Sequence, residues 1–199
     1  MNFDELRKVL VLTANRSIKR QYRYFLLKRS RLSEPEVRHV MTKILEERRC
    51  YYAIEVATKE KHLITGKAIQ RSALTDLVIY GDTRTNETPI WIELKRGQPK
   101  IDKIAKDFVK MISEPSLAGA CFFHILPEGP LAEIGLNERA RRAVIDKYRV
   151  AYNMVSKKGC QNKWFSLFIL DSVSRQYYIL FEEDLCSIED FTKGEWKKL

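Results

Sequence analysis

Two apolar runs in the middle of the chain, separated by a polar turn, constrain its fold most strongly. Residues 74–80 read Leu-Thr-Asp-Leu-Val-Ile-Tyr, and residues 89–96 read Pro-Ile-Trp-Ile-Glu-Leu-Lys-Arg. The turn-rich residues 81–87 between them suit an antiparallel connection. Because side chains alternate between the two faces of a strand, Glu93 and Lys95 share one face. Charged groups inside such apolar runs must be solvated, paired or metal-bound, so the sequence predicts a polar site on these strands.

Asp76, Glu93 and Lys95 together have the composition of a divalent-metal phosphodiesterase site. Mg²⁺ prefers oxygen ligands and usually takes few protein carboxylates, and Asp76 and Glu93 can supply them. A bound metal lowers the pKa of its water and polarises the phosphate. The alternative is a nearly neutral surface ion pair between Glu93 and Lys95 on an exposed strand face.

The spacing of these residues resembles that of the PD-(D/E)xK nuclease superfamily. Asp76 followed by Glu93-Leu94-Lys95 carries the resemblance, which covers roughly residues 33–126. Thr75 stands where the family often has proline. The resemblance implies an α/β restriction-endonuclease-like fold, in which a central mixed sheet contains an αβββαβ core, and a metal-dependent nuclease activity.

The Glu-x-Lys tripeptide alone is a weak signal. Glu195-Trp196-Lys197 repeats it beside the C-terminus, where no apolar strand with an aspartate precedes it. We interpret that second copy as a solvated tail. The context of Glu93, between an apolar strand and a helix, distinguishes the first copy.

The resemblance also implies roles for individual residues. Asp76 and Glu93 would bind Mg²⁺ or Mn²⁺, and the backbone carbonyl of Leu94 would complete the protein ligands. Lys95 would stand beside the attacking water, where it orients the water or stabilises negative charge. Recombination nucleases of this superfamily often carry glutamine on the helix after the lysine, and this chain has none there.

Family members often add a metal-binding glutamate from the first core helix. We assign Glu36 to that role, with Glu34 as the substitute. Ser33 is an N-cap candidate and Glu36 completes a capping box with it, so capping is an equal alternative for Glu36. Glu55 could also be a ligand, although a salt bridge is the favoured interpretation.

Hydrophobic periodicity predicts an α/β chain folded as one domain over residues 1–199. Residues 1–32 form a basic helical extension, residues 33–126 the catalytic core, and residues 127–199 a C-terminal helix and strands packed on the core. The core order is helix, three strands, helix, strand, as in the superfamily. The expected helices are Phe3–Leu12, Ile18–Leu26, Ser33–Arg49, Asp102–Met111 and Leu136–Arg149, and the expected strands are Tyr51–Thr58, Leu74–Tyr80, Ile90–Lys95, Ala118–Leu126, Trp164–Leu170 and Gln176–Phe181.

The net charge of +10 is concentrated near the N-terminus. Between Leu6 and Ser33 the chain has no acidic residue and nine basic ones. A basic end joined to a mixed body indicates a polyanionic partner, although a solvated basic helix face is the alternative. We assign nucleic-acid contacts to Arg16, Lys19, Arg20, Arg23, Arg71, Lys106 and Lys110.

Cysteine usage and hydropathy indicate the compartment. The four cysteines are scattered, without a C-x-x-C pair, which predicts free thiols in a reducing, cytoplasmic setting. No apolar run is long enough to span a bilayer, and the N-terminus lacks the basic-then-apolar order of a signal peptide. His39, His62 and His124 lack metal-ligand spacing, and His124 is expected to be a satisfied core residue.

We therefore expect a Mg²⁺-dependent deoxyribonuclease, an endonuclease whose partner is DNA, with a homodimer left open. The first rival is an inactive nuclease-like module that binds nucleic acid or assembles a larger complex. The second is a basic α/β protein in which Asp76, Glu93 and Lys95 form only a structural ion network.

Overall fold

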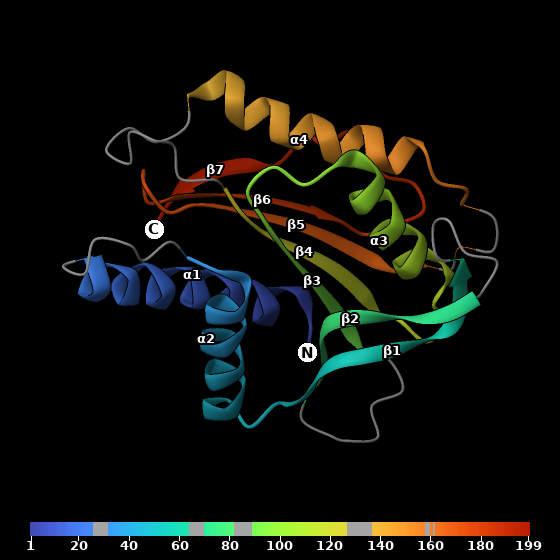
Figure 1. Ribbon diagram of the computed structural model, residues 1–199, viewed down its shortest axis with the longest axis horizontal. Coiled ribbons are helices and arrows are strands. Elements are labelled where there is room, and N and C mark those ends of the chain that lie inside the picture. Colours follow the sequence, from blue (N-terminus) through green and yellow to red (C-terminus); the bar gives the residue numbers. More distant parts are fainter. Residues whose placement is uncertain (26–31, 64–69, 82–88, 127–136, 158–159, 161) are drawn as a thin grey trace.

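The computed structural model describes residues 1–25, 32–63, 70–81, 89–126, 137–157, 160 and 162–199, with the backbone alone at 22–25, 59–63 and 70–72. These residues form four helices and seven strands (Figure 1). In chain order they are α1 (Phe3–Phe25), α2 (Glu34–Glu47), β1 (Tyr51–Leu63), β2 (Gln70–Gly81), β3 (Ile90–Arg96), α3 (Ile101–Ser113), β4 (Gly119–Ile125), α4 (Glu138–Asn153), β5 (Trp164–Asp171), β6 (Gln176–Glu182) and β7 (Glu195–Lys198).

The described strands form one mixed sheet in the order β1-β2-β3-β4-β5-β6-β7. Strands β1, β2 and β3 are antiparallel, β3, β4 and β5 are parallel, and β5, β6 and β7 are again antiparallel. The α/β class with a mixed sheet is therefore confirmed. Residues 33–126 also contain the expected sequence of elements: α2, β1, β2, β3, α3 and β4.

Helices cover both faces of the sheet (Figure 1). Helices α1 and α2 pack on one face over a core that includes Leu10, Met41 and Phe123. Helices α3 and α4 pack on the other face over a second core. Strand β4 is buried along its whole length, as its continuous hydrophobicity predicts.

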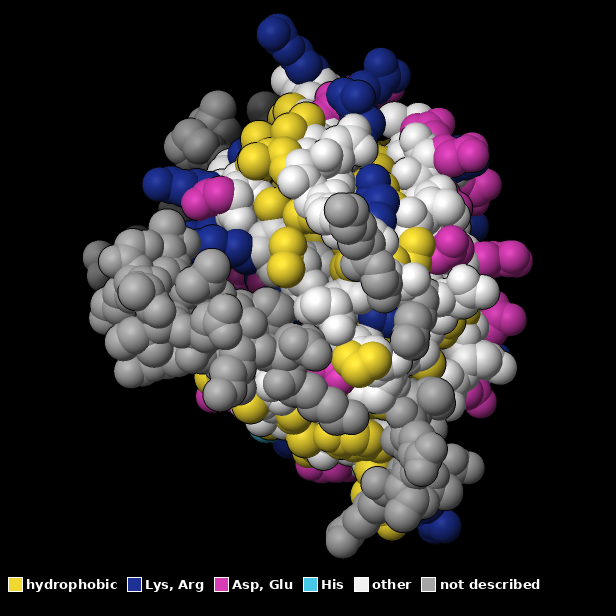
Figure 2. All heavy atoms as spheres, turned by 90° about the vertical axis from the view of Figure 1, so that its right-hand side faces the viewer, with side chains coloured by type: hydrophobic (Ala, Val, Ile, Leu, Met, Phe, Trp, Pro, Cys, Tyr) yellow, Lys and Arg dark blue, Asp and Glu magenta, His cyan; other side chains and the backbone are white. Residues whose placement is uncertain are grey.

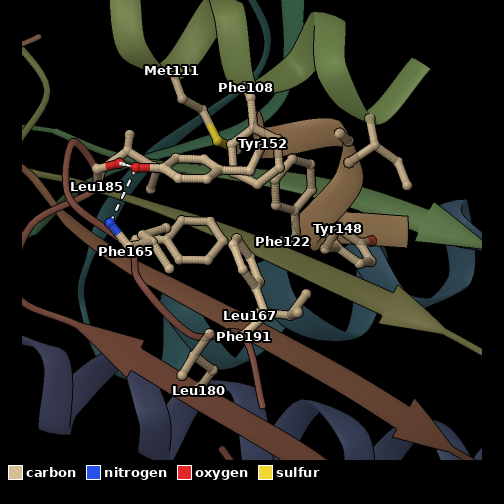
Figure 3. Close-up of a cluster of buried hydrophobic side chains, with 14 of the residues drawn as sticks. Phe108, Met111, Phe122, Tyr148, Tyr152, Phe165, Leu167, Leu180, Leu185 and Phe191 are labelled. Atoms are coloured by element: carbon tan, nitrogen blue, oxygen red, sulfur yellow. Dashed lines mark hydrogen bonds between the residues drawn. The ribbon is translucent and has the colours of Figure 1, made fainter. Parts of the chain in front are cut away.

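Several aromatic side chains pack against one another in the core beneath α3 and α4 (Figure 3). The ring of Phe108 on α3 meets Phe122 edge-on at 5.0 Å and Tyr152 at 5.3 Å between centroids. Such edge-to-face contacts add to the free energy gained from burying apolar area. This packing fixes α3 against the sheet, and α3 carries two side chains of the candidate site.

Helix α1 is continuous, whereas the sequence predicted two helices separated by residues 13–17. Thr13 is buried on the same stripe as Leu10 and Ala14. Its hydroxyl donates to the Val9 carbonyl at 2.7 Å, so this polar residue is satisfied inside the helix and does not interrupt it. No described helix has the length and hydropathy needed to cross a membrane.

Residues 195–198 form strand β7, so the interpretation of this segment as a solvated tail was wrong. Trp196 lies opposite Tyr178 of β6, and their rings are 5.6 Å apart between centroids. The guanidinium of Arg141 on α4 stacks over the Trp196 ring at 4.5 Å. Partial burial of the Trp196 ring therefore stabilises residues 195–198, whose other side chains are charged, as the edge strand of the sheet.

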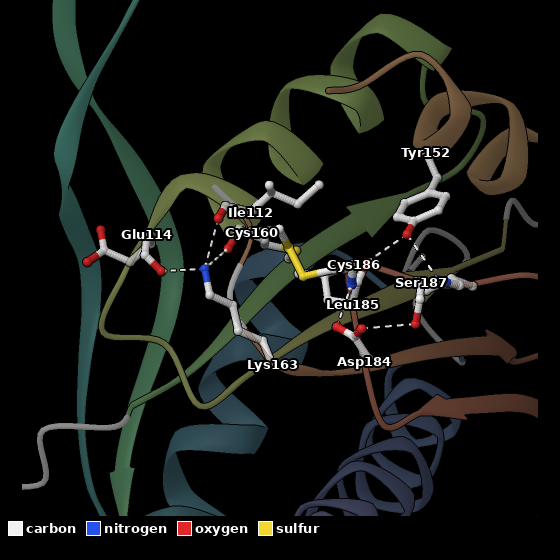
Figure 4. Close-up of a disulfide and its surroundings, with 11 residues drawn as sticks. Ile112, Glu114, Tyr152, Cys160, Lys163, Asp184, Leu185, Cys186 and Ser187 are labelled. Carbon is white, nitrogen blue, oxygen red and sulfur yellow. Dashed lines mark hydrogen bonds between the residues drawn. A yellow bond between two sulfur atoms is a disulfide. The ribbon is translucent and has the colours of Figure 1, made fainter. Parts of the chain in front are cut away.

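Cys160 and Cys186 form a disulfide (Figure 4), so the prediction of free thiols was wrong for this pair. The two cysteines are 26 residues apart in the chain, but Leu185 holds their segments together. Its N–H donates to the Lys163 carbonyl, and its own carbonyl accepts the Tyr152 hydroxyl at 2.8 Å. The sequence contains no C-x-x-C spacing that would indicate the Cys160–Cys186 contact.

Buried Lys163 caps the end of α3 beside this disulfide (Figure 4). Its ammonium donates to the carbonyls of Met111 and Ile112, both at 2.9 Å, and to that of Glu114. A cation at a helix C-terminus satisfies unpaired carbonyls and opposes the negative end of the helix dipole. The C-terminal region therefore helps to fix the position of α3.

Candidate active site

The candidate residues lie where β2 and β3 separate. The last pair in the register joins Leu77 of β2 to Ile92 of β3. Asp76 directly precedes Leu77, and Glu93 directly follows Ile92. The Asp76 carboxylate accepts the backbone N–H of Leu94 at 2.7 Å, so a side chain replaces the neighbouring strand as the acceptor. The negative charge of Asp76 acts on both Glu93 and Lys95. The structure thus brings the three predicted catalytic side chains together.

Glu93 is only 2% exposed. Its Oε1 accepts the Thr75 hydroxyl at 2.8 Å and the Lys110 ammonium at 2.6 Å. Its Oε2 lies 3.5 Å from Lys95 Nζ. Burial on this scale overturns the alternative of an exposed surface ion pair. A proline in place of Thr75 could not donate the hydroxyl bond, so this departure from the family pattern has a local role.

Asp107 and Lys110 on helix α3 complete a closed ring of alternating charges with Glu93 and Lys95. Asp107 Oδ2 accepts Lys95 Nζ at 2.9 Å, and Asp107 Oδ1 accepts Lys110 Nζ at 2.7 Å. Lys110 also donates to the Leu74 carbonyl at 3.0 Å, and Lys95 donates to the Leu94 carbonyl at 3.1 Å. Buried charges are tolerated when paired and hydrogen-bonded in this way.

Burial and neighbouring charges shift the proton affinities of this ring. Burial, followed by the charge of Asp107, raises the pKa of Glu93 to about 7, although Lys110 and Lys95 oppose the shift. Burial lowers the pKa of Lys95, but the carboxylates of Asp107 and Glu93 outweigh it and raise that pKa overall. Lys95 is therefore a firmly protonated ammonium, suited to stabilising negative charge rather than to accepting a proton.

Glu34, and not Glu36, is the helix glutamate at this site. Burial is the main cause of the raised pKa of Glu34, and its carboxylate interacts with Lys95, Asp76 and the backbone N–H of Arg96. The Glu36 carboxylate instead accepts the Ser33 N–H at 2.9 Å and completes the capping box. The preference for Glu36 as a ligand therefore fails, because capping turns its side chain back onto the helix start.

Glu55 forms an exposed salt bridge with Arg38 at 3.0 Å. The favoured interpretation of this residue is therefore confirmed, and its carboxylate is committed to the surface of β1.

Carboxylates outnumber cations at the site. Four carboxylates face two ammonium groups and the exposed guanidinium of Arg96, whose charge acts on Glu34, so one negative charge remains when all seven groups are ionised. Among the described residues, no three His, Cys, Asp or Glu side chains are already arranged as a metal cage. Mg²⁺ commonly binds through one or two carboxylates, waters and substrate phosphates, so the donor chemistry fits that ion. The seven groups are Glu34, Asp76, Glu93, Asp107, Lys95, Arg96 and Lys110.

His124 supports the site from β4, where it lies opposite Lys95 in the register. Its Nε2 lies 3.0 Å from the Gly97 carbonyl, and its Nδ1 lies 3.0 Å from the Tyr148 hydroxyl. A carbonyl can only accept, so Nε2 carries the proton and Nδ1 accepts from Tyr148. Its burial and these two hydrogen-bond partners confirm the expected satisfied core residue, and burial lowers the pKa of His124 to about 4.

The predicted nucleic-acid contacts are found in different settings. Lys110 is buried in the charge ring and cannot contact a backbone phosphate, so that assignment was wrong. Arg16 pairs with Glu47 at 2.7 Å. The side chains of Lys19 and Arg20 on α1 and of Lys106 on α3 are exposed. The side chains of Arg23 and Arg71 lie outside the described residues. Figure 2 shows both signs of charge on one face of the molecule, with acidic side chains gathered along one side.

Asp107 and Lys110 had no assigned role in catalysis, although the sequence contained a signal for them. Asp107 follows Ile104 by three residues and precedes Met111 by four, so it lies on the apolar stripe of α3. A charged residue on such a stripe must find a partner. Glu93 and Lys95, on the preceding strand, were the available partners.

No family model, curated protein or solved structure matches this chain.

Proposed function

We propose that this chain is a metal-dependent nuclease of the PD-(D/E)xK type that hydrolyses phosphodiester bonds in DNA. One observation carries the proposal: Asp76, Glu93 and Lys95 lie together where β2 separates from β3. The order α2, β1, β2, β3, α3, β4 around them supports it, because this is the core order that the sequence motif implies.

The side chains divide the chemistry between them. Asp76, Glu93 and the carbonyl of Leu94 would hold Mg²⁺ or Mn²⁺. When bound, such an ion polarises the phosphate and lowers the pKa of a coordinated water. Lys95 remains protonated beside Asp107, so it orients the water or stabilises charge on the phosphoryl oxygens.

Substrate binding is assigned to exposed basic residues. Lys19 and Arg20 on α1 and Lys106 on α3 present their side chains to solvent. Contacts between such groups and backbone phosphates release counterions, so the affinity for DNA should fall steeply as salt rises. A flat salt dependence would count against this assignment.

A panel of substrates tests the proposal. Supercoiled, linear, single-stranded and branched DNA, together with RNA, would be incubated with the protein and either Mg²⁺, Mn²⁺ or EDTA. The proposal expects cleavage of at least one DNA form with a metal and none with EDTA. Metal-independent cleavage, or no cleavage of any substrate, would contradict it.

A non-catalytic nuclease-like module is the second candidate. The closed ring favours this candidate, because both Glu93 oxygens already face ammonium groups. A buried ring of this kind can also be retained only because it favours one conformation of the fold. DNA binding without any effect of Mn²⁺ would support this candidate over the first.

A further inference from the structure

The two oxygens of Glu93 have different surroundings. Oε1 accepts both the Thr75 hydroxyl at 2.8 Å and the Lys110 ammonium at 2.6 Å. Oε2 lies 3.5 Å from Lys95 Nζ, which is long for a charge-assisted hydrogen bond. Oε1 therefore bonds tightly to two protein groups, whereas a metal ion could readily replace Lys95 at Oε2.

Lys110 is a cation built into the core. Its ammonium bonds to Glu93, to Asp107 at 2.7 Å and to the Leu74 carbonyl at 3.0 Å. These three acceptors match the three N–H donors of a lysine. Moving Lys110 away would leave two buried carboxylate oxygens without their cation, which is strongly unfavourable.

Lys95 is held differently. Its shortest contact, at 2.9 Å, is with Asp107, whereas its two longer contacts are with Glu93 Oε2 and with the Leu94 carbonyl at 3.1 Å. Those two acceptors are the atoms assigned to the metal. The Lys95 ammonium can release them and stay anchored on Asp107.

Resting on the proposed function, we propose that Lys110 limits this site to one divalent ion by holding Oε1 of Glu93 permanently. Glu93 then offers only Oε2 to the ion, beside Asp76 and the Leu94 carbonyl. The four carboxylates of the site are already opposed by Lys95, Lys110 and Arg96, so one dication more than neutralises the remaining negative charge, and a second dication would leave further uncompensated positive charge in a buried region.

Calorimetric titration with MnCl₂ tests this role on metal-stripped protein. The wild type should bind one Mn²⁺. Lys110→Met fills the same space without the charge, and its stoichiometry should rise from one Mn²⁺ to two, because Glu93 Oε1 is released and a unit positive charge close to the ions is removed. Lys103→Met is the matched control, since Lys103 is exposed on the same helix, and it should behave as the wild type.

The outcomes separate this inference from the proposed function. A wild type that binds no Mn²⁺ would contradict the proposed metal-dependent function. Two ions in the wild type, or a single bound ion in Lys110→Met as in Lys103→Met, would overturn only the role of Lys110. If thermal melting shows that Lys110→Met is unfolded, Lys110→Gln takes its place in the comparison with Lys103→Met. Glutamine removes the charge but keeps N–H donors for Glu93 and the Leu74 carbonyl.

Discussion

The Asp107 carboxylate accepts the Lys95 ammonium at 2.9 Å, linking helix α3 to the strand that carries the candidate motif. The other oxygen of Asp107 accepts Lys110 at 2.7 Å. The orientation of Lys95 therefore depends on the docking of α3, which the Phe108 core and the Lys163 cap both maintain. A residue outside the motif thus positions the lysine within it.

Replacing Asp107 should impair catalysis more than substrate binding. Asp107→Asn keeps the size of the side chain but removes the charge that anchors Lys95, and we expect kcat to fall about 10- to 100-fold, as for partners that orient functional groups. Steady-state kinetics on the DNA form that is cleaved would measure it. Asp102→Asn, an exposed change on the same helix, should have little effect. A lowered affinity with unchanged kcat would contradict the positioning role.

Glu34 and Glu36 should separate metal binding from helix capping. Glu34→Gln removes a carboxylate that interacts with Asp76 and Lys95, so Mn²⁺ affinity should fall while the melting temperature is maintained. Glu36→Ala removes the side chain that accepts the Ser33 N–H in the capping box and should lower stability by about 1 kcal/mol, the net contribution of a hydrogen bond, without changing Mn²⁺ affinity. Calorimetry and thermal melting of both variants would check the contrast. The reverse pattern would return the ligand role to Glu36.

The metal-free protein should lose stability as the pH rises from 4.5 to about 7, with no further loss from Glu93 at higher pH. The pKa of Glu93 is raised from 4.5 to about 7 by burial and by Asp107. The native state therefore holds a proton that the unfolded state releases above its lower pKa, so this contribution is complete at low pH and lost through about pH 7. Thermal melts in EDTA should show a steeper decline for the wild type than for Glu93→Gln. Parallel curves would mean that Glu93 does not titrate in this range.

The disulfide should stabilise the C-terminal region measurably. A bridge between residues 26 apart restricts the unfolded chain and contributes about 3.5 kcal/mol in the chain-entropy account. Cys160→Ser, or reduction of the wild type, should lower the melting temperature, and reduction should have no further effect on the variant. Peptide mapping under non-reducing conditions would identify the Cys160–Cys186 pair directly, and its absence after oxidative refolding would contradict this bond.

Local pattern was enough to predict much of the fold. Strand and helix periodicity located β2, β3, α3 and β4, and the capping box located the start of α2. Periodicity could not reveal which distant side chains meet: the Cys160–Cys186 bond and the pairing of β7 depend on tertiary packing. At the site, the sequence predicted Asp76, Glu93 and Lys95. It could not decide between Glu34 and Glu36, because that choice depends on which carboxylate bonds to the backbone N–H of Ser33 in the helix cap.

Cleavage of supercoiled plasmid DNA should distinguish the wild type from Lys95→Ala. With Mg²⁺ present, we expect nicked or linear product from the wild type, none from Lys95→Ala, and comparable DNA binding by both proteins. Equal cleavage by the two proteins, or cleavage that persists in EDTA, would contradict this expectation.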